Sequence, residues 1–334
     1  MENKKPIKWI LYTAALFLIV LLTGIICLSI GPTSISFRNI MEAFKTGKNS
    51  VNYDIIFDLR LPRIILGFAV GGSLSLAGVI LQGMFKNPLV EPYTLGISGG
   101  GALGVCLGIV FKLTSLIGSF ALPICGFLGS ILVILLVYSL SVKKGILKIQ
   151  GLLLTGVMIS FISSSLIMLI MAVSNAANLQ GIIFWTMGSL EQPHWILIKT
   201  MLFVSILGLF ISYFFSINLN AFSLGEEEAH HLGIDTEKTK KILFVLSSLL
   251  TGVAVSVSGI IGFVGLAVPH FMRRVVGTDH RILLVSSFLA GAGFLIICDT
   301  IARTIIAPME LPVGVITGIV GGSLFVYFLS KKIS

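Results

Sequence analysis

The residues best suited to chemistry form one short polar stretch, FSLGEEEAHHLGI, at residues 222–234. Carboxylates and imidazoles bind metals and transfer protons, so the stretch could be a metal site or an acid–base site. Glu226 and His230 are four residues apart, as are Glu227 and His231, which places each pair on one face of a helix. Three adjacent glutamates nevertheless point around a helix and do not converge on one ion. We therefore expect surface ion pairs here, with no metal and no cofactor.

The rest of the chain sets where this stretch can lie. Mean hydropathy is +1.05, and 56% of the 334 residues are hydrophobic while 11% are charged. A soluble protein carries about 25% charged residues. About 20 apolar residues cross a bilayer, and ten apolar runs are present: 9–30, 62–83, 94–111, 116–140, 150–173, 195–216, 242–260, 262–276, 282–305 and 312–330. The prediction is an all-α, polytopic membrane protein with about ten transmembrane helices in one domain, residues 1–334.

Basic residues predict the orientation of these helices. If the N-terminus is cytoplasmic, the cytoplasmic loops collect most of the Lys and Arg residues, among them Lys238, Lys240, Lys241, Arg274 and Arg281. The positive-inside rule then places both termini, and the polar stretch, in the cytoplasm. The net charge of +9 is explained by loop bias and membrane lipid, so no nucleic-acid partner is expected. The first run is expected to be a retained anchor in the cell membrane rather than a cleaved signal peptide.

Several other kinds of site are disfavoured. The four cysteines lie singly in apolar runs without a C-x-x-C pair, which indicates neither zinc nor disulfides. His194, His270 and His280 are too scattered for a membrane enzyme. An ion-coupled transporter would need an intramembrane carboxylate, and Asp299 comes closest, but Arg303 lies one turn away. The sequence contains no G-x-x-x-x-G-K-[ST] loop, so ATP would have to be hydrolysed by another subunit.

Prolines and glycines mark where helices break and pack. Pro88 and Pro92 interrupt FKNPLVEPYTLG, and irregular backbone at membrane depth usually lines a cavity or is buried in protein. Glycines repeat every four residues, which predicts flat faces for close helix packing. These glycines are Gly96, Gly100, Gly104 and Gly108 in one run and Gly314, Gly318 and Gly322 in another.

Arginines near the opposite side allow two interpretations. Arg60 and Arg63 are one helical turn apart in DLRLPR, and Arg303 follows Asp299 by four residues. Arg60 and Arg63 could be snorkelling helix ends, and Asp299 and Arg303 could form an ion pair within one helix. Alternatively, the three arginines form an outward basic patch that receives carboxylates of another protein.

Taken together, several segments resemble the FecCD family, the permease subunits of type II ABC importers. They include LRLPRIILGF and KNPLVEPYTLG within residues 59–104, LNAFSLGEEEAHHLGI at 219–234, SGIIGFVGLAVPHFMRR within 258–281 and ELPVGVITGIVGG at 310–322. The resemblance implies a ten-helix permease that pairs with a second permease chain, expected to be an identical copy. It also implies a cytoplasmic ABC ATPase dimer and an extracytoplasmic substrate-binding protein as partners.

The resemblance also implies roles for individual residues. Arg60, Arg63 and Arg303 match arginines that receive acidic residues of the binding protein. Asn87, Pro88 and Leu89 match a turn that helps form a cytoplasmic gate. The second half of the gate corresponds to about Ile149 and Gln150, where this sequence departs from the small hydroxyl residues of the vitamin B12 permease.

The polar stretch matches the coupling segment that fits into the ATPase, at about residues 219–236. Its contact residues are expected to be Ser223, Leu224, Gly225, Glu226, Glu227, Glu228, His230, His231, Leu232 and Gly233. Ser223 and Glu226 are spaced as a capping box, Gly233 suits a helix C-terminus, and Asp235 can cap the next helix. The expected function is ATP-driven import of a bulky metal chelate, first an iron(III)–siderophore, with haem or cobalamin as alternatives. An ion-coupled secondary transporter is the alternative from another class.

Overall fold

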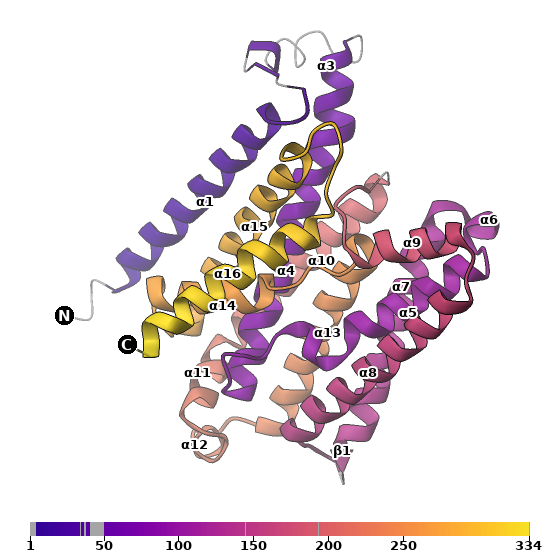
Figure 1. Cartoon of the computed structure of the whole chain (residues 1–334). Coiled ribbons are helices and arrows are strands. Elements are labelled where there is room, and N and C mark those ends of the chain that lie inside the picture. The colour runs from indigo at the N-terminus through magenta and orange to yellow at the C-terminus, as the bar shows by residue number, and fades with distance from the viewer. Residues whose placement is uncertain are drawn as a thin grey trace.

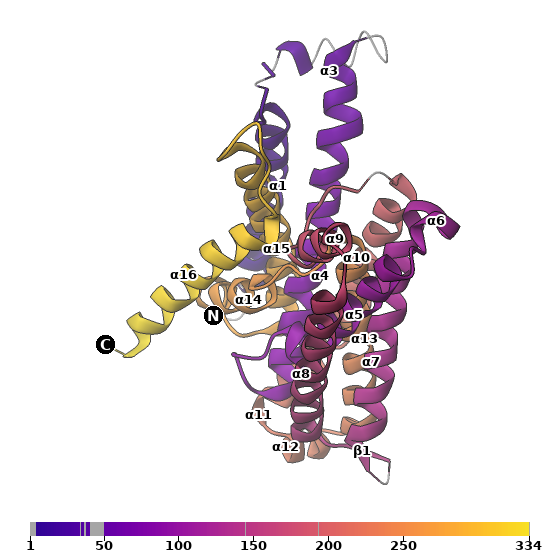
Figure 2. The same ribbon diagram turned by 45° about the vertical axis from the view of Figure 1, so that its right-hand side comes forward.

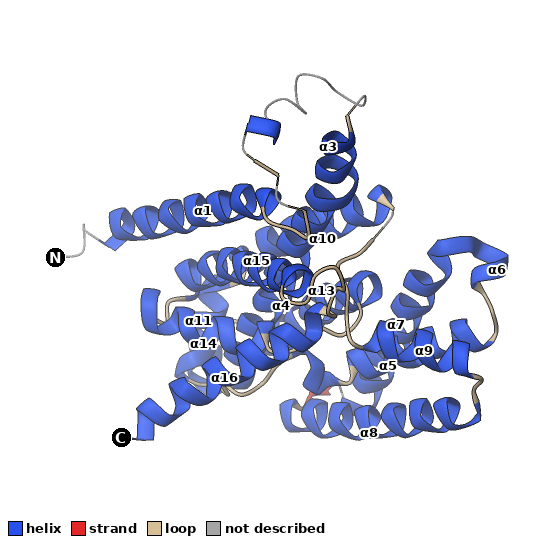
Figure 3. Ribbon diagram, turned by 45° about the horizontal axis from the view of Figure 1, so that its top comes forward, coloured by secondary structure: helices blue, strands red, loops and turns tan. Residues whose placement is uncertain are grey.

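The computed structural model describes residues 5–33, 35–36, 38–40, 50–143, 145–192 and 194–333, and most of them are helical (Figures 1 and 3). The long helices are α1 (Lys5–Ser29), α4 (Leu61–Phe85), α5 (Ile97–Val110), α7 (Ala121–Ser141), α8 (Ile149–Val173), α10 (Trp195–Phe214), α13 (Thr236–Ser258), α14 (Val264–Val276), α15 (His280–Thr304) and α16 (Val313–Ile333). The short elements are α3 (Val51–Asp54), the π-helix η3 (Ile55–Arg60), the 3-10 helices η4 (Pro92–Leu95) and η5 (Gly118–Phe120), α6 (Thr114–Ile117), α9 (Ala176–Thr186), α11 (Ser216–Leu224), α12 (Glu226–His231), β1 (Val142–Lys143) and β2 (Ile146–Leu147).

The expected all-α fold is confirmed, and each of the ten predicted apolar runs coincides with one long helix. Seven helical stretches are long and apolar enough to cross a membrane, and α5 and α16 are shorter apolar helices. The helices and the apolar runs differ at some boundaries. α13 begins at Thr236, directly after the predicted cap Asp235 and six residues before the apolar run that starts at 242. α6 and η5 occupy much of the start of the run 116–140.

Helix α4 forms the centre of the bundle (Figure 2). It packs against α15, α13, α10 and α14, and every residue from Ala69 to Phe85 is buried. A helix that is apolar all round either is buried in protein or faces lipid, and α4 is buried in protein. In contrast, α1 and α8 lie at the periphery with most of their apolar side chains exposed, as expected for helices that face lipid (Figure 3).

Small residues let α4 approach its neighbours at backbone distance. A Cβ atom on Gly71 would lie 2.3 Å from the carbonyl oxygen of Gly291 in α15, and one on Gly78 would lie 1.9 Å from a carbonyl of α14. The predicted glycine face of α5 meets α7 in the same way at Gly100 and Gly104. The repeat in α16 is mixed: a Cβ on Gly314 would meet the backbone carbonyls of Met187 and Ile260, whereas one on Gly318 would have no atom within 4 Å.

Two ends of the bundle carry most of the polar features. At the end that is lowest in Figure 1, α11 and α12 lie near the hairpin of β1 and β2, and we call this the α12 end. Val142 pairs with Leu147 and Lys143 with Ile146 in that antiparallel hairpin. At the top of Figure 1, η3 and α3 continue α4 beyond the bundle, and we call this the α3 end. The predicted docking arginines lie toward the α3 end, and the predicted gate and coupling residues toward the α12 end.

Candidate functional sites at the two ends of the bundle

Arg60 is buried at the α3 end, where it holds the end of α1. Its guanidinium is 3% exposed and donates to the backbone carbonyl of Leu28 at 2.6 Å and to that of Thr33. The last carbonyls of a helix have no partner within the helix, so a cation there satisfies and stabilises them. A Cβ on Gly31 would lie 2.4 Å from the same guanidinium, so the chain after α1 also covers it. Arg60 therefore fastens α1 to α4.

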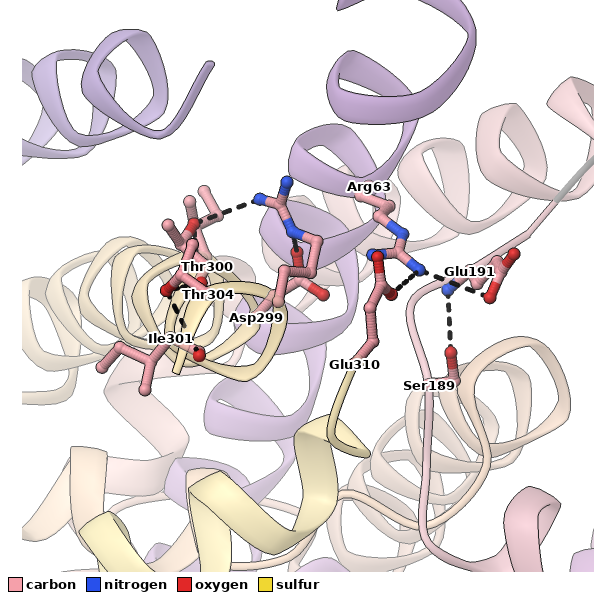
Figure 4. A network of polar contacts seen from close by, with 10 residues as sticks. Arg63, Ser189, Glu191, Asp299, Thr300, Ile301, Thr304 and Glu310 are labelled. Atoms are coloured by element: carbon pink, nitrogen blue, oxygen red, sulfur yellow. Dashed lines mark hydrogen bonds and ion pairs between the residues drawn. The ribbon is translucent and has the colours of Figure 1, made fainter. Parts of the chain in front are cut away.

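Arg63, in the first turn of α4, joins two loops that are distant in sequence. Its Nη2 atom lies 2.7 Å from Oε2 of Glu310 and 3.4 Å from Oε2 of Glu191. Glu310 lies between α15 and α16, and Glu191 lies between α9 and α10. Figure 4 shows both carboxylates turned toward the guanidinium. The Arg63 side chain is 12% exposed, whereas Glu310 is 41% and Glu191 is 77% exposed.

Arg303 forms the predicted ion pair with Asp299, which is confirmed. Its Nε donates to Oδ2 of Asp299 at 2.9 Å, and its Nη2 donates to the hydroxyl of Thr300 at 3.2 Å. Both charged side chains are buried, at 4% and 7% exposure. A buried charge is tolerated when it is paired and hydrogen-bonded. Of the three arginines predicted to receive carboxylates, Arg60 and Arg303 are thus enclosed and Arg63 lies nearest the surface.

The coupling segment at the α12 end consists of two helices that break at Gly225. Gly225 has a φ of +151°, a conformation that favours glycine. The predicted capping box of Ser223 and Glu226 is wrong. Ser223 lies in the last turn of α11 and donates back to the carbonyl of Asn220 at 2.5 Å. The glycine break, rather than a serine cap, separates the two helices.

The end of α12 and the start of α13 agree with the prediction. Gly233 has a φ of +84° and donates its N–H to the carbonyl of His230, while Ile234 donates to that of Ala229. This pair of bonds is the Schellman motif, which satisfies the last carbonyls of a helix. Asp235 accepts the N–H of Lys238 at 3.0 Å and caps α13.

The coupling segment presents a mixed polar and apolar surface. Leu224 and Leu232 are 65% and 64% exposed, although they lie outside the apolar helices. Exposed large apolar side chains grouped within a polar rim mark contact surfaces. The other exposed members are Ser223, Glu226, Glu227, Glu228, His230, His231 and Gly233. Among the described residues, no group of three or more His, Cys, Asp or Glu side chains could hold a metal ion.

Lys240 connects the coupling segment to the hairpin before α8. Its side chain is 3% exposed, and its Nζ atom lies 2.5 Å from Oε1 of Glu226 and also pairs with Glu237. Nζ further donates to the carbonyl of Leu147 in β2 at 3.4 Å. Glu237 accepts the N–H of the same leucine at 2.8 Å. One buried ammonium therefore links α12, α13 and β2.

A small pocket lies where the coupling segment meets the end of α4 and the start of α8. It is lined by Met84, Phe85, Lys86, Ile149, Phe222, Glu226 and Lys240. The first three residues end α4 just before the predicted gate turn, and Ile149 begins α8. Phe222 and Glu226 of the coupling segment therefore lie beside the end of α4 and the start of α8, although the predicted gate turn at residues 87–89 does not itself line the pocket.

The turn after α4 has a defined geometry. Lys86 ends α4 with a φ of +51°, and the side chain of Asn87 accepts the N–H of Leu89 at 2.9 Å. Asparagine favours such turns because its side chain mimics a backbone acceptor. Leu89 is 54% exposed and Gln150 is exposed as well. Both segments therefore combine a fixed backbone with accessible side chains.

Asn220 fixes α11 to the start of α15. Its Oδ1 accepts the N–H of His280 at 2.8 Å, and its Nδ2 donates to Oδ1 of Asp279 at 3.0 Å. Hydrogen bonds from Arg281, followed by that from Asn220, lower the pKa of the Asp279 carboxyl below its usual range. The coupling segment is therefore held from two sides, by Lys240 through α12 and by Asn220 through α11.

Comparison with known proteins places these features in a family. The model of the FecCD transport family matches residues 18–331. The chain is 39% identical over 310 residues to the hemin transport system permease protein HmuU of Yersinia pestis, covering 91% of this chain and 90% of the relative. It is 32% identical over 332 residues to the iron(3+)-hydroxamate import system permease protein FhuG of Bacillus subtilis (strain 168), covering 98% of each chain. The chain belongs to the FecCD transport family.

A solved structure has the same architecture. It is a metal-chelate type ABC transporter in an inward-facing conformation, with a TM-score of 0.85, 33% identity and coverage of 96% of this chain and 98% of the other. This FecCD protein is therefore a multi-pass permease subunit of an ABC importer in a cell membrane. Its family implies a separate ATPase subunit, which hydrolyses ATP, and a binding protein.

Several residues of this FecCD permease were not identified from the sequence. Glu191, Glu310 and Glu237 pair with cations, and Leu147 joins the hairpin to α13. Lys240 was identified only as a basic loop residue. The one sequence signal for its pairing is the spacing of Glu237 and Lys240, three residues apart on a helix.

Proposed function

We propose that this permease carries a bulky metal chelate, delivered by an extracytoplasmic binding protein, and that a cytoplasmic ATPase dimer drives it through the coupling segment. The observation that carries this proposal is that Glu226 and Lys240 share a pocket with the end of α4, just before one proposed gate segment, and with Ile149 of the other. A force applied to α12 would reach the hairpin before α8 through Lys240, which pairs with Glu226 and donates to the carbonyl of Leu147. It would reach the end of α4 through the shared pocket.

The exposed surface of the coupling segment supports an ATPase partner. Leu224 and Leu232 supply apolar contact, and the glutamates and histidines between them supply charged groups at its edge. Buried apolar anchors within a polar rim are typical of protein interfaces. The contact residues are Ser223–Gly233 without Ala229, whose side chain is buried.

The proposed gate consists of Asn87, Pro88 and Leu89 on one segment and Ile149 and Gln150 on the other. Leu89 lies in the turn after α4 and Gln150 in the first turn of α8, so a small rotation of α4 or α8 would change their separation. Two conformations with different ATPase and binding-protein contacts are sufficient for coupled transport, because each partner then biases the same equilibrium.

Docking of the binding protein is proposed for the α3 end, with Arg63 as the principal contact. Arg60 and Arg303 are enclosed by Leu28, Thr33 and Asp299. Arg60 and Arg303 would contact the binding protein only if these internal hydrogen bonds and ion pairs broke. If the α3 end faces the binding protein outside the cell, the α12 end and both termini face the cytoplasm. A second, identical permease chain is proposed to complete the translocation path.

The proposed cargo is an iron(III)–siderophore, with haem or cobalamin as the other chelates to test. The similarity to FhuG, whose name specifies iron(3+)-hydroxamate, supports the first, and the similarity to the hemin permease HmuU supports the second. Titration of the binding protein encoded beside the permease with ferric hydroxamate, haem and cobalamin would identify the cargo. Tight binding of haem or cobalamin alone would refute the siderophore assignment.

Uptake into proteoliposomes tests the transport mechanism itself. Permease and ATPase are reconstituted with enclosed ATP, and the loaded binding protein is added outside. Uptake is expected only when ATPase, ATP and binding protein are all present. Uptake that persists without the ATPase and follows an ion gradient would favour the secondary-transporter alternative. The burial and pairing of Asp299, the best candidate for an ion site, weigh against that alternative.

A further inference from the structure

Arg63 differs from the other two arginines of the α3 end in the kind of partner that it has. Arg60 is held by backbone carbonyls, and Arg303 is held by a buried carboxylate of its own helix. Arg63 is held by Glu310 and Glu191, which lie on two loops and are 41% and 77% exposed. Its partners are therefore the ones that solvent, or another protein, can reach.

Both carboxylates use the same nitrogen of Arg63. Oε2 of Glu310 lies 2.7 Å and Oε2 of Glu191 lies 3.4 Å from Nη2. Ion pairs with exposed members contribute little to stability, because water and salt replace them readily. A carboxylate from outside could therefore take the place of either glutamate, and the resulting contact would be better screened from water.

The two loops that carry these glutamates also have different attachments. Next to Glu191, the N–H of Ser189 donates to the carbonyl of Ser258 at the end of α13, at 2.8 Å. Glu191 and Ser189 also line a pocket together with Trp185 and Ser258. Glu310 precedes α16 and lies one residue before Leu311, whose N–H donates to α15. Arg63 thus ties a pocket wall and the entry to α16 to the central helix α4.

From this arrangement we propose that Glu310 and Glu191 are internal competitors of the binding protein for Arg63. In the undocked permease they occupy the guanidinium and hold the two loops against α4. When the binding protein docks, its carboxylates replace them and release both loops. The proposed partner is therefore a protein with an acidic surface. Its docking would change the position of the two loops, because it displaces the glutamates that hold them against α4. The inference rests on the proposed docking role of Arg63.

The exchange is tested by measuring the affinity of the cognate binding protein for the permease–ATPase complex in nanodiscs. Glu310→Gln should tighten docking about two- to five-fold, the range expected when one exposed ion pair is removed as a competitor. The double variant Glu191→Gln/Glu310→Gln should tighten it up to about tenfold. The gain should shrink as salt is raised, because salt screens the competing pairs.

Two further variants separate this inference from the docking proposal. Asp58→Asn removes a carboxylate that is also exposed near the α3 end but is not among the described partners of Arg63, so docking should change little. Arg63→Gln should weaken docking about tenfold or more. In that background Glu310→Gln should no longer tighten it. Unchanged docking in Arg63→Gln would overturn the docking role itself. If Arg63→Gln weakens docking but Glu310→Gln alone, in the permease that keeps Arg63, does not tighten it, the exchange would be overturned while the docking role stands.

Discussion

Replacing Lys240 with Met removes the ammonium that joins α12 to the hairpin while keeping most of the apolar stem. The substitution deletes the charge-assisted contacts with Glu226 and Glu237 and the weaker one with Leu147. Hydrogen bonds to charged groups contribute about 1.5–3 kcal/mol each. Glu226 and Glu237 are 50% and 31% exposed, so water would recover much of that energy. We estimate that the interaction of α12 with α13 and the hairpin loses about 2 kcal/mol net. This loss raises the population of permease in which α12 is detached from them about 30-fold.

The expected result is loss of coupling rather than loss of folding. In proteoliposomes, Lys240→Met should retain basal ATP hydrolysis while the chelate transported per ATP falls about tenfold or more. Lys238→Met is the matched control, because this lysine is exposed on the same helix, and it should couple normally. Glu226→Gln, which keeps a hydrogen bond to Lys240, should be intermediate. A folded Lys240→Met permease with the wild-type ratio of transport to hydrolysis would refute the linkage.

Three further predictions concern stability and assembly. Arg60→Met should lower the free energy of unfolding by about 2–3 kcal/mol in thermal melts, because the carbonyls of Leu28 and Thr33 lose a charged donor. An unchanged melting temperature would contradict the role of Arg60 in fastening α1 to α4. Gly71→Ala should cost about 1–3 kcal/mol by overpacking against α15, whereas Gly318→Ala, with open space around it, should cost nothing; equal melting temperatures would count against close packing. Leu224→Ala/Leu232→Ala should weaken ATPase binding about tenfold or more, measured by titration in nanodiscs, and full affinity would exclude these anchors.

Much of the fold could be predicted because membrane helices have a strong local signal. A run of about 20 apolar residues is itself a structural requirement, so the long helices were located to within a few residues. The apolar run alone places the start of α13 six residues too late, because Thr236–Lys241 is charged, whereas the predicted cap at Asp235 marks the true start. The break at Gly225 was also missed, since the serine and glutamate around it fit a common capping pattern.

The site residues were identified less completely, because their partners are distant in sequence. The Arg63–Glu310 contact joins positions 247 residues apart, and the Arg60–Leu28 contact joins positions 32 apart. Periodicity cannot reveal such contacts, whereas the Asp299–Arg303 pair lies within one helical turn and was foreseen. The sequence identified Arg60, Arg63 and Arg303 as candidates for docking, and the packing shows that Arg63 lies nearest the surface.

Motion of the gate in response to nucleotide tests the central claim most directly. Spin labels on Leu89 and Gln150, which are both exposed, would report the separation of the two gate segments in the permease–ATPase complex. The account predicts that a non-hydrolysable ATP analogue shifts this distance distribution in the otherwise native protein. It also predicts that Lys240→Met abolishes most of the shift while the analogue still binds. A distance distribution that does not change when the nucleotide analogue is added, or that shifts fully in Lys240→Met, would contradict the account.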